Sequence, residues 1–129
     1  MLSEESAHQV EWEMVDDFVD TSIEMLLSEG KLEEYSLLKN SKECRLNGRL
    51  SIMQVLQTTC MCLFDYPDLV IEYQRFFSSE QVTFHNDFNR DGEFTQILIS
   101  IAADLPTSTS AAAVIINRRN GIVQCTIVL

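Results

Sequence analysis

One stretch of the sequence has the spacing of a calcium-binding loop. The residues with side-chain oxygens in the segment DFNRDGEF are Asp87, Asn89, Asp91 and Glu93. Oxygens at alternate positions before the turn at Gly92 match the opening of a helix-loop-helix calcium site. The twelfth position of such a loop binds the ion through two carboxylate oxygens, and Leu98 stands there. The alternative is an Asp-Gly turn between two strands, capped by Asn and Asp side chains.

Residues suited to acid-base or nucleophilic catalysis are sparse. The two histidines, His8 and His85, lie far apart in the sequence. We find no nucleophile elbow, no phosphate-binding glycine loop and no Cys-x-x-Cys pair. We therefore expect a protein that is not an enzyme and that takes no cofactor. A small enzyme that acts through His85 and neighbouring acids, without a recognisable motif, is the alternative.

The composition narrows the class of partner. The 129 residues carry a formal net charge of −11, whereas nucleic acids and anionic membranes are bound by basic faces. We therefore expect a protein partner, basic or presenting an amphipathic helix, and neither nucleic acid nor membrane. Self-association is left open. No apolar run reaches the length of about 18 residues that a membrane helix needs, and the N-terminus does not resemble a signal peptide. We expect a soluble intracellular protein, cytoplasmic or nuclear.

The chain contains four cysteines, and their spacing does not suggest a metal site. Cys60 and Cys62 lie two apart on an expected helix, where their side chains diverge. We expect reduced thiols, mostly in the core. The even number also permits disulfides.

Two amphipathic helices that meet at Pro67 are the clearest signal in the sequence. The apolar residues at helical spacing in the first are Ile52, Met53, Leu56, Cys60, Leu63 and Phe64. Those in the second are Leu69, Val70, Tyr73, Phe76 and Phe77. Proline is favoured in the first turn of a helix because its missing N–H has no partner there. The spacing therefore predicts a helical pair between Arg49 and Phe77.

Two further helices are expected before this pair. Ser6 and Gln9 have the form of a capping box, and a helix of about 20 residues should follow and end at Gly30. Its apolar residues are Trp12, Met14, Val15, Phe18, Val19, Met25 and Leu26. A short helix should occupy residues 31–41, and residues 40–48 read as a polar connection with an Asn-Gly turn.

The character of the sequence changes after residue 79. Short apolar runs at residues 82–84, 94–101, 112–119 and 122–129 predict strands. Asn120 and Gly121 suit a two-residue type I′ turn, which would place Ile116 opposite Cys125 and Val114 opposite Ile127. The sequence thus predicts one α+β domain over residues 1–129, helical in residues 1–79 and strand-rich in residues 80–129, whose small antiparallel sheet packs on the helices.

Residues 10–79 resemble the paired amphipathic helix domain of the Sin3 family of corepressors. The stretch LFDYPDLVIEYQRFF, from Leu63 to Phe77, is similar to that family's pattern between its third and fourth helices. That pattern has a leucine and phenylalanine, a short turn, a proline-aspartate-leucine segment and a closing phenylalanine. Residues 17–39 would then be the first two helices of the domain.

The resemblance implies a groove between the first two helices that receives an amphipathic helix of a partner. The residues that would line this groove are Val15, Phe18, Val19, Tyr35 and Leu38. The alternative is that the same residues close the core against the sheet. We therefore expect a non-enzymatic interaction module or complex subunit, which binds a partner through the helical groove or the edge of the terminal hairpin. A calcium-responsive binding module remains the alternative function.

Overall fold

The computed structural model describes residues 10–79, 81–102 and 113–128. The helices in these ranges are α2 (Trp12–Ser28), α3 (Leu32–Leu46), α4 (Ile52–Cys62) and α5 (Pro67–Arg75). The strands are β1 (Val82–Phe88), β2 (Phe94–Ile101), β3 (Ala113–Arg119) and β4 (Ile122–Val128). Helices followed by an antiparallel sheet confirm the predicted α+β fold.

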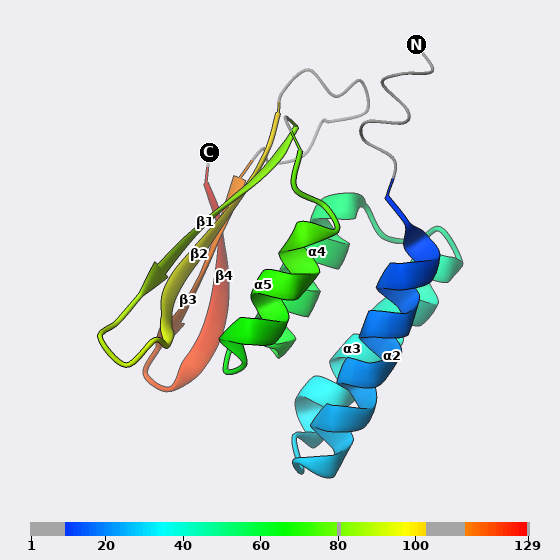
Figure 1. The fold of residues 1–129 in the computed structure, drawn as a ribbon, viewed down its shortest axis with the longest axis horizontal. Coiled ribbons are helices and arrows are strands. Elements are labelled where there is room, and N and C mark those ends of the chain that lie inside the picture. The colour runs from blue at the N-terminus through cyan, green and yellow to red at the C-terminus, as the bar shows by residue number, and fades with distance from the viewer. Residues whose placement is uncertain (1–9, 80, 103–112, 129) are drawn as a thin grey trace.

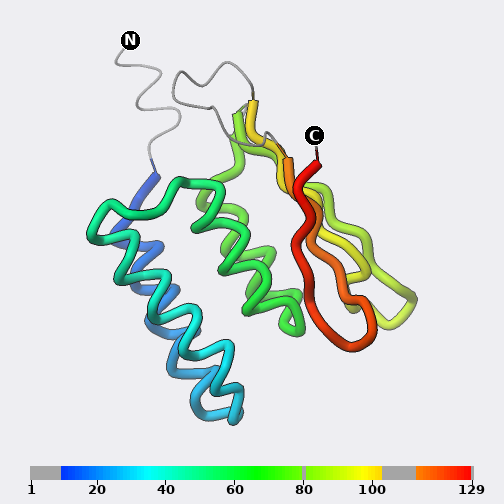
Figure 2. Tube along the Cα trace, turned by 180° about the vertical axis from the view of Figure 1, so that it is seen from behind, coloured from blue at the N-terminus to red at the C-terminus, as the bar shows by residue number. Residues whose placement is uncertain are grey.

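The elements form three layers (Figures 1 and 2). Helices α4 and α5 lie between the sheet and the hairpin of α2 and α3, so the described helices all lie on one face of the sheet. The middle layer is the most deeply buried. The buried residues of α4 are Met53, Val55, Leu56, Thr59, Cys60 and Cys62. A helix that is apolar on most sides needs neighbours on most sides, and α4 has them in α3 and in the sheet.

Helix α2 ends where the sequence predicts, at Gly30. Gly30 has a φ of 75°, which costs glycine little because it has no Cβ. Its backbone N–H donates to Leu27 O at 3.1 Å, and the N–H of Lys31 donates to Leu26 O at 2.9 Å. This pair of bonds is the Schellman arrangement, and it reverses the chain into α3.

Helix α3 is longer than the sequence predicts, because residues 42–46 continue the helix predicted for residues 31–41 instead of forming a polar connection. The reason is that the inward side chains of this segment are polar and contact the acidic side of α2. Arg45 pairs with Asp16 and lies 4.2 Å from the centre of the Trp12 ring. Lys42 pairs with Asp20 at 2.5 Å. A search for apolar periodicity cannot detect a helix held by charges.

The central helical pair begins as predicted. A capping box starts α4: Gln54 N–H donates to Ser51 Oγ at 3.3 Å, and Ser51 N–H donates to Gln54 Oε1 at 2.9 Å. These bonds satisfy backbone donors that the helix leaves free. Pro67 occupies the first turn of α5 and Asp68 follows it, which confirms the predicted start of this helix.

The sheet is an antiparallel meander in the order β1-β2-β3-β4. Both residues of the terminal turn, Asn120 and Gly121, have positive φ, as a type I′ turn requires. Ile116 pairs with Cys125, which confirms the predicted register. Strand β1 continues to Phe88, beyond the predicted residue 84, and its pairing with β2 shifts register between Asp87 and Phe88.

A reciprocal amide pair joins the helical layer to the sheet. Gln74 Nε2 donates to Asn86 Oδ1 at 3.0 Å, and Asn86 Nδ2 donates to Gln74 Oε1 at 2.8 Å. Gln74 on α5 is buried, and Asn86 on β1 is half-buried. Because each amide supplies both a donor and an acceptor, the pair satisfies both polar groups at an apolar interface.

Candidate functional site

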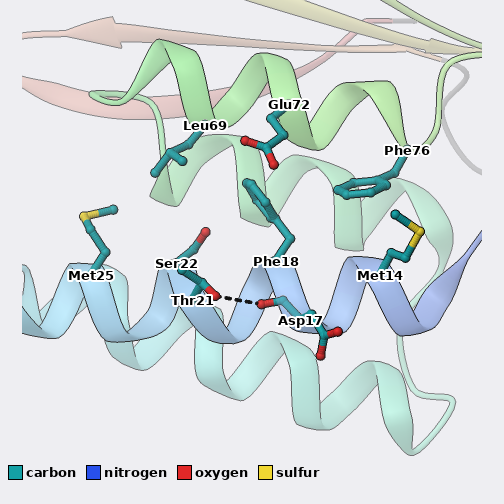
Figure 3. A pocket seen from close by; sticks show the side chains of 9 residues that line it. All are labelled: Met14, Asp17, Phe18, Thr21, Ser22, Met25, Leu69, Glu72 and Phe76. Carbon is teal, nitrogen blue, oxygen red and sulfur yellow. Dashed lines mark hydrogen bonds between the residues drawn. The ribbon is translucent and has the colours of Figure 1, made fainter.

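Helix α2 has more apolar surface than one neighbour can cover. One set of its residues is buried, namely Val15, Val19, Ile23 and Leu26. A second set lies next to the first around the helix and is at least partly exposed, namely Met14, Phe18 and Met25. Residues at spacings of three and four share a helix face, so the second set forms a continuous strip. This strip faces α5 (Figure 3).

The strip forms one wall of a hollow between α2 and α5 with a volume of about 430 Å³, which we call the α2–α5 groove. Its lining residues are Met14, Asp17, Phe18, Thr21, Ser22, Met25, Leu69, Glu72 and Phe76. Figure 3 shows Leu69, Glu72 and Phe76 pointing from α5 toward α2. The lining is mainly apolar, and the groove lies open along the surface.

Aromatic rings set the floor of the groove. The centre of the Phe18 ring lies 5.9 Å from that of Tyr73 and 5.9 Å from that of Phe76. Tyr73 is buried, so it fixes Phe18 from below, while Met14 beside Phe76 is 54% exposed. Aromatic rings at this separation attract one another. The groove therefore has a firm aromatic floor and a flexible methionine at one end.

The polar residues in the groove lining are acidic or neutral. Asp17 and Glu72 contribute one carboxylate from each helix, and neither forms an ion pair with another described residue. Thr21 Oγ1 donates to the backbone oxygen of Asp17 at 3.0 Å. The chain as a whole is strongly acidic, so the groove attracts positive charge.

The five residues predicted to bind a partner lie in three different places. Val15, Val19 and Leu38 are buried in the core, and the hollow beside them, between α2 and α3, measures only about 10 Å³. Tyr35 is half-buried on α3, with Lys39 Nζ 5.7 Å from its ring centre. Phe18 alone among the five lines the α2–α5 groove. The structure therefore places the open hollow against α5 and not between the first two helices.

Within the segment DFNRDGEF, residues 89–93 form the turn between β1 and β2. Asn89 Oδ1 accepts hydrogen bonds from the N–H groups of Asp91 at 2.9 Å and Glu93 at 3.0 Å. That oxygen therefore caps the backbone, as the turn interpretation expects. Within the described ranges, no three His, Cys, Asp or Glu residues form a group that could hold a metal ion, so Asp87, Asp91 and Glu93 do not gather.

His85 lies on the face of the sheet away from the helices. Its side chain is 71% exposed, and its Nε2 lies 3.4 Å from Asp87 Oδ1. A general base works in a site that excludes water and positions a substrate. An open position on a sheet provides neither.

Two of the four thiols are buried in the core, and the other two are half-buried. Burial raises the pKa of Cys60 to about 12 and that of Cys62 to about 12. Burial also raises the pKa of Cys125, which is half-buried. The thiolate is the reactive form of cysteine, so burial keeps Cys60 and Cys62 inert. None of the four cysteines is bonded to another.

Sequence reasoning missed the partnership of α2 with α5. Leu69 and Phe76 appear in the predicted inward stripe of α5, yet both are only half-buried and line the groove. One signal was available: the apolar face of α2 extends beyond a single stripe to include Met14 and Met25. Such excess width indicates a second contact surface.

Comparison with protein-family models, curated proteins and solved structures finds no match for this chain. Of the helices in residues 10–79, none has the length and apolar character needed to cross a bilayer.

Proposed function

We propose that this chain is a non-enzymatic protein-interaction module that binds an amphipathic helix of a partner in the α2–α5 groove. The observation that carries the proposal is an open apolar groove with an aromatic floor and a carboxylate from each wall. Its volume of about 430 Å³ is within the usual range for binding pockets, roughly 300–1,000 Å³.

The length of the groove suits a helix better than a small molecule. Met14 and Met25 stand at its two ends on α2, and eleven residues of helix span about 16 Å. A partner helix with apolar anchors at i, i+3 or i+4, and i+7 needs about 10 Å. Methionine side chains adapt to different apolar surfaces, so Met14 and Met25 suit a helix whose anchors vary in shape.

The acidic residues of the groove indicate which charged residues the partner should carry. Asp17 and Glu72 would face Lys or Arg side chains beside the apolar anchors, and the net charge of −11 would speed their encounter. The same charge argues against nucleic acid and anionic membrane as partners. Buried free thiols at Cys60 and Cys62 suit a reducing compartment, the cytoplasm or the nucleus.

Selection from a random peptide library displayed on phage tests this proposal. We expect enriched peptides with apolar residues at i, i+3 or i+4, and i+7 and with Lys or Arg between them. Met14→Asp should abolish their binding, since Met14 lines the groove. The free energy of unfolding should change by less than about 0.5 kcal/mol, because the side chain is largely exposed.

Leu27→Asp is the matched control. Leu27 is on the same helix, is 48% exposed and lies outside the groove lining, so its variant should bind the selected peptides like the original chain. Equal binding of the selected peptides by the Met14→Asp variant would refute the groove as the site, as would enriched peptides without helical spacing.

A further inference from the structure

The two edges of the sheet differ in how they resist pairing with another strand. Strand β1 contains His85 and Asp87, and its pairing is irregular next to Phe88. Charges and bulges of this kind protect an edge from a further strand. Strand β4, IVQCTIV, contains no charged residue and no proline, and its pairing with β3 is regular over all seven residues. Within Ile122–Val128, β4 thus has none of these protective features.

Apolar side chains on both faces of β4 remain exposed. Ile127 and Val123 point to the helix side, because their partners Val114 and Arg118 share a face with Ile116. Ile127 is nevertheless 59% exposed, and Ile122 on the opposite face is 61% exposed. Each face of this edge therefore has apolar surface that the described residues leave uncovered.

The sequence of β4 is symmetric by residue type about Cys125. Reading outward from Cys125 in both directions gives a polar residue and then two apolar residues. The pairs equidistant from the centre are Gln124 with Thr126, Val123 with Ile127, and Ile122 with Val128. A strand with this symmetry can pair with a copy of itself in antiparallel orientation so that every residue faces one of its own kind.

We infer that β4 pairs with β4 of a second copy of this chain, in the register that places Cys125 opposite Cys125 of that copy. This joins two four-stranded sheets into one across a two-fold axis. A shift of one residue would set the helix face of one copy beside the outer face of the other, and a shift of two residues would leave fewer residue pairs, so the symmetric register is favoured. It would form roughly six backbone hydrogen bonds across the seven residue pairs.

Two copies repel each other through their net charge of −11 each, and Glu33 and Glu34 share a hollow with Ile122 and Val123, but the strand contact itself is free of charge. The acidic residues of α2 lie in the layer farthest from the sheet (Figure 1), and β4 places no charge opposite another. A single strand pair is a small interface, so we expect a dimer that exchanges with monomer at roughly micromolar concentration. The α2–α5 groove lies in the helical layers and takes no part, so this inference stands independently of the proposed function.

Analytical ultracentrifugation of the full chain over a range of concentrations tests the dimer and its register together. Gln124 and Thr126 are exposed, and each would face the other across the axis. The double variant Gln124→Lys with Thr126→Lys places two pairs of like charges opposite each other across the axis. It should therefore raise the dissociation constant of the dimer roughly tenfold or more. The double variant Gln124→Lys with Thr126→Glu places opposite charges at the same positions and should retain the dimer.

A third variant controls for total charge. Thr83→Lys with His85→Lys adds two lysines to exposed positions of the β1 edge and should leave the dimer intact. Circular dichroism confirms that each variant folds. A chain that stays monomeric throughout the concentration range would overturn the inference. So would a dimer that the double-lysine variant of β4 retains, since the contact would then lie elsewhere.

Discussion

The two sides of helix α2 meet their neighbours in opposite ways. Toward α3, Asp16 pairs with Arg45 and Asp20 pairs with Lys42, and only about 10 Å³ remains between the helices. Toward α5, the same helix presents Met14 and other apolar side chains to a hollow of about 430 Å³. The side of α2 that forms ion pairs with α3 is closed, and the side that faces α5 is open. An apolar surface left open beside a well-packed core is the kind of surface that partners use.

The spacing of the helices explains much of this difference. Helix α2 packs closely along α3 but approaches α5 at few points. Side chains of α5 from Leu69 to Phe76 face the strip along its length, and Phe76 lies beside Met14 (Figure 3). The side of α2 toward α5 is therefore open because the two helices stand apart, and the side chains between them do not fill the space.

The largest difference in the free energy of unfolding is expected between substitutions at two adjacent residues of α2, one buried in the core and one lining the groove. Leu26 is fully buried, so Leu26→Ala should lower the free energy of unfolding by about 2–5 kcal/mol. Met25 lines the groove and is half-buried, so Met25→Ala should cost less than about 1 kcal/mol. Urea unfolding measures both. Equal costs for the two variants would contradict the division of α2 into a closed and an open side.

The free energy of unfolding at alkaline pH should depend on the buried thiols of the core. A thiol ionises near pH 9.0 in the unfolded chain, but burial keeps Cys60 and Cys62 protonated to about pH 12 in the folded chain. Between these values the unfolded state binds fewer protons. The two buried thiols therefore contribute their full stabilisation below pH 9. Above pH 9 the free energy of unfolding falls by about 1.4 kcal/mol per pH unit for each thiol.

The measurement is urea unfolding at several pH values above 9. Cys62→Ala should reduce the slope of the free energy of unfolding against pH, because it removes one of the two buried thiols. A slope that does not respond to Cys62→Ala would mean that this thiol is not sealed in the core.

A smaller loss of stability is expected from substitutions that remove the ion pairs between α2 and α3. Arg45→Met removes the ion pair with Asp16 and the contact with the Trp12 ring, so we expect a loss of about 1–2 kcal/mol. Lys42→Met should cost less than about 1 kcal/mol, since its partner Asp20 is more exposed. A double-mutant cycle with Asp16→Asn isolates the pair, and a coupling near zero would show that Arg45 contributes by packing alone.

Local signals in the sequence predict most of the elements. The Asn120-Gly121 turn sets the register of the terminal hairpin because only a few residues accept its backbone angles. Gly30 and Pro67 mark a helix end and a helix start for similar reasons. Each of these signals acts within a few residues, so it can be read without knowledge of the tertiary structure.

The groove depends on contacts between distant parts of the chain, which periodicity does not reveal. Leu69 and Phe76 are about fifty residues from the strip of α2 that they face. Periodicity does not predict the helical state of residues 42–46 for a related reason, since their contacts with α2 are polar. The role of Val15, Phe18, Val19, Tyr35 and Leu38 in partner binding stays a prediction, in which Phe18 has the most suitable position.

The amide pair between Gln74 and Asn86 restricts how the sheet can dock on the helices. Its neighbours on the same face of β1 are apolar, with Phe84 two residues away. If the sheet slid along α5 by one such step, Gln74 would meet a phenyl ring, and two amides would lose their partners at roughly 1–3 kcal/mol each. Apolar layers alone would tolerate several alignments of similar energy. The amide pair thus favours the observed alignment over those that would separate Gln74 from Asn86.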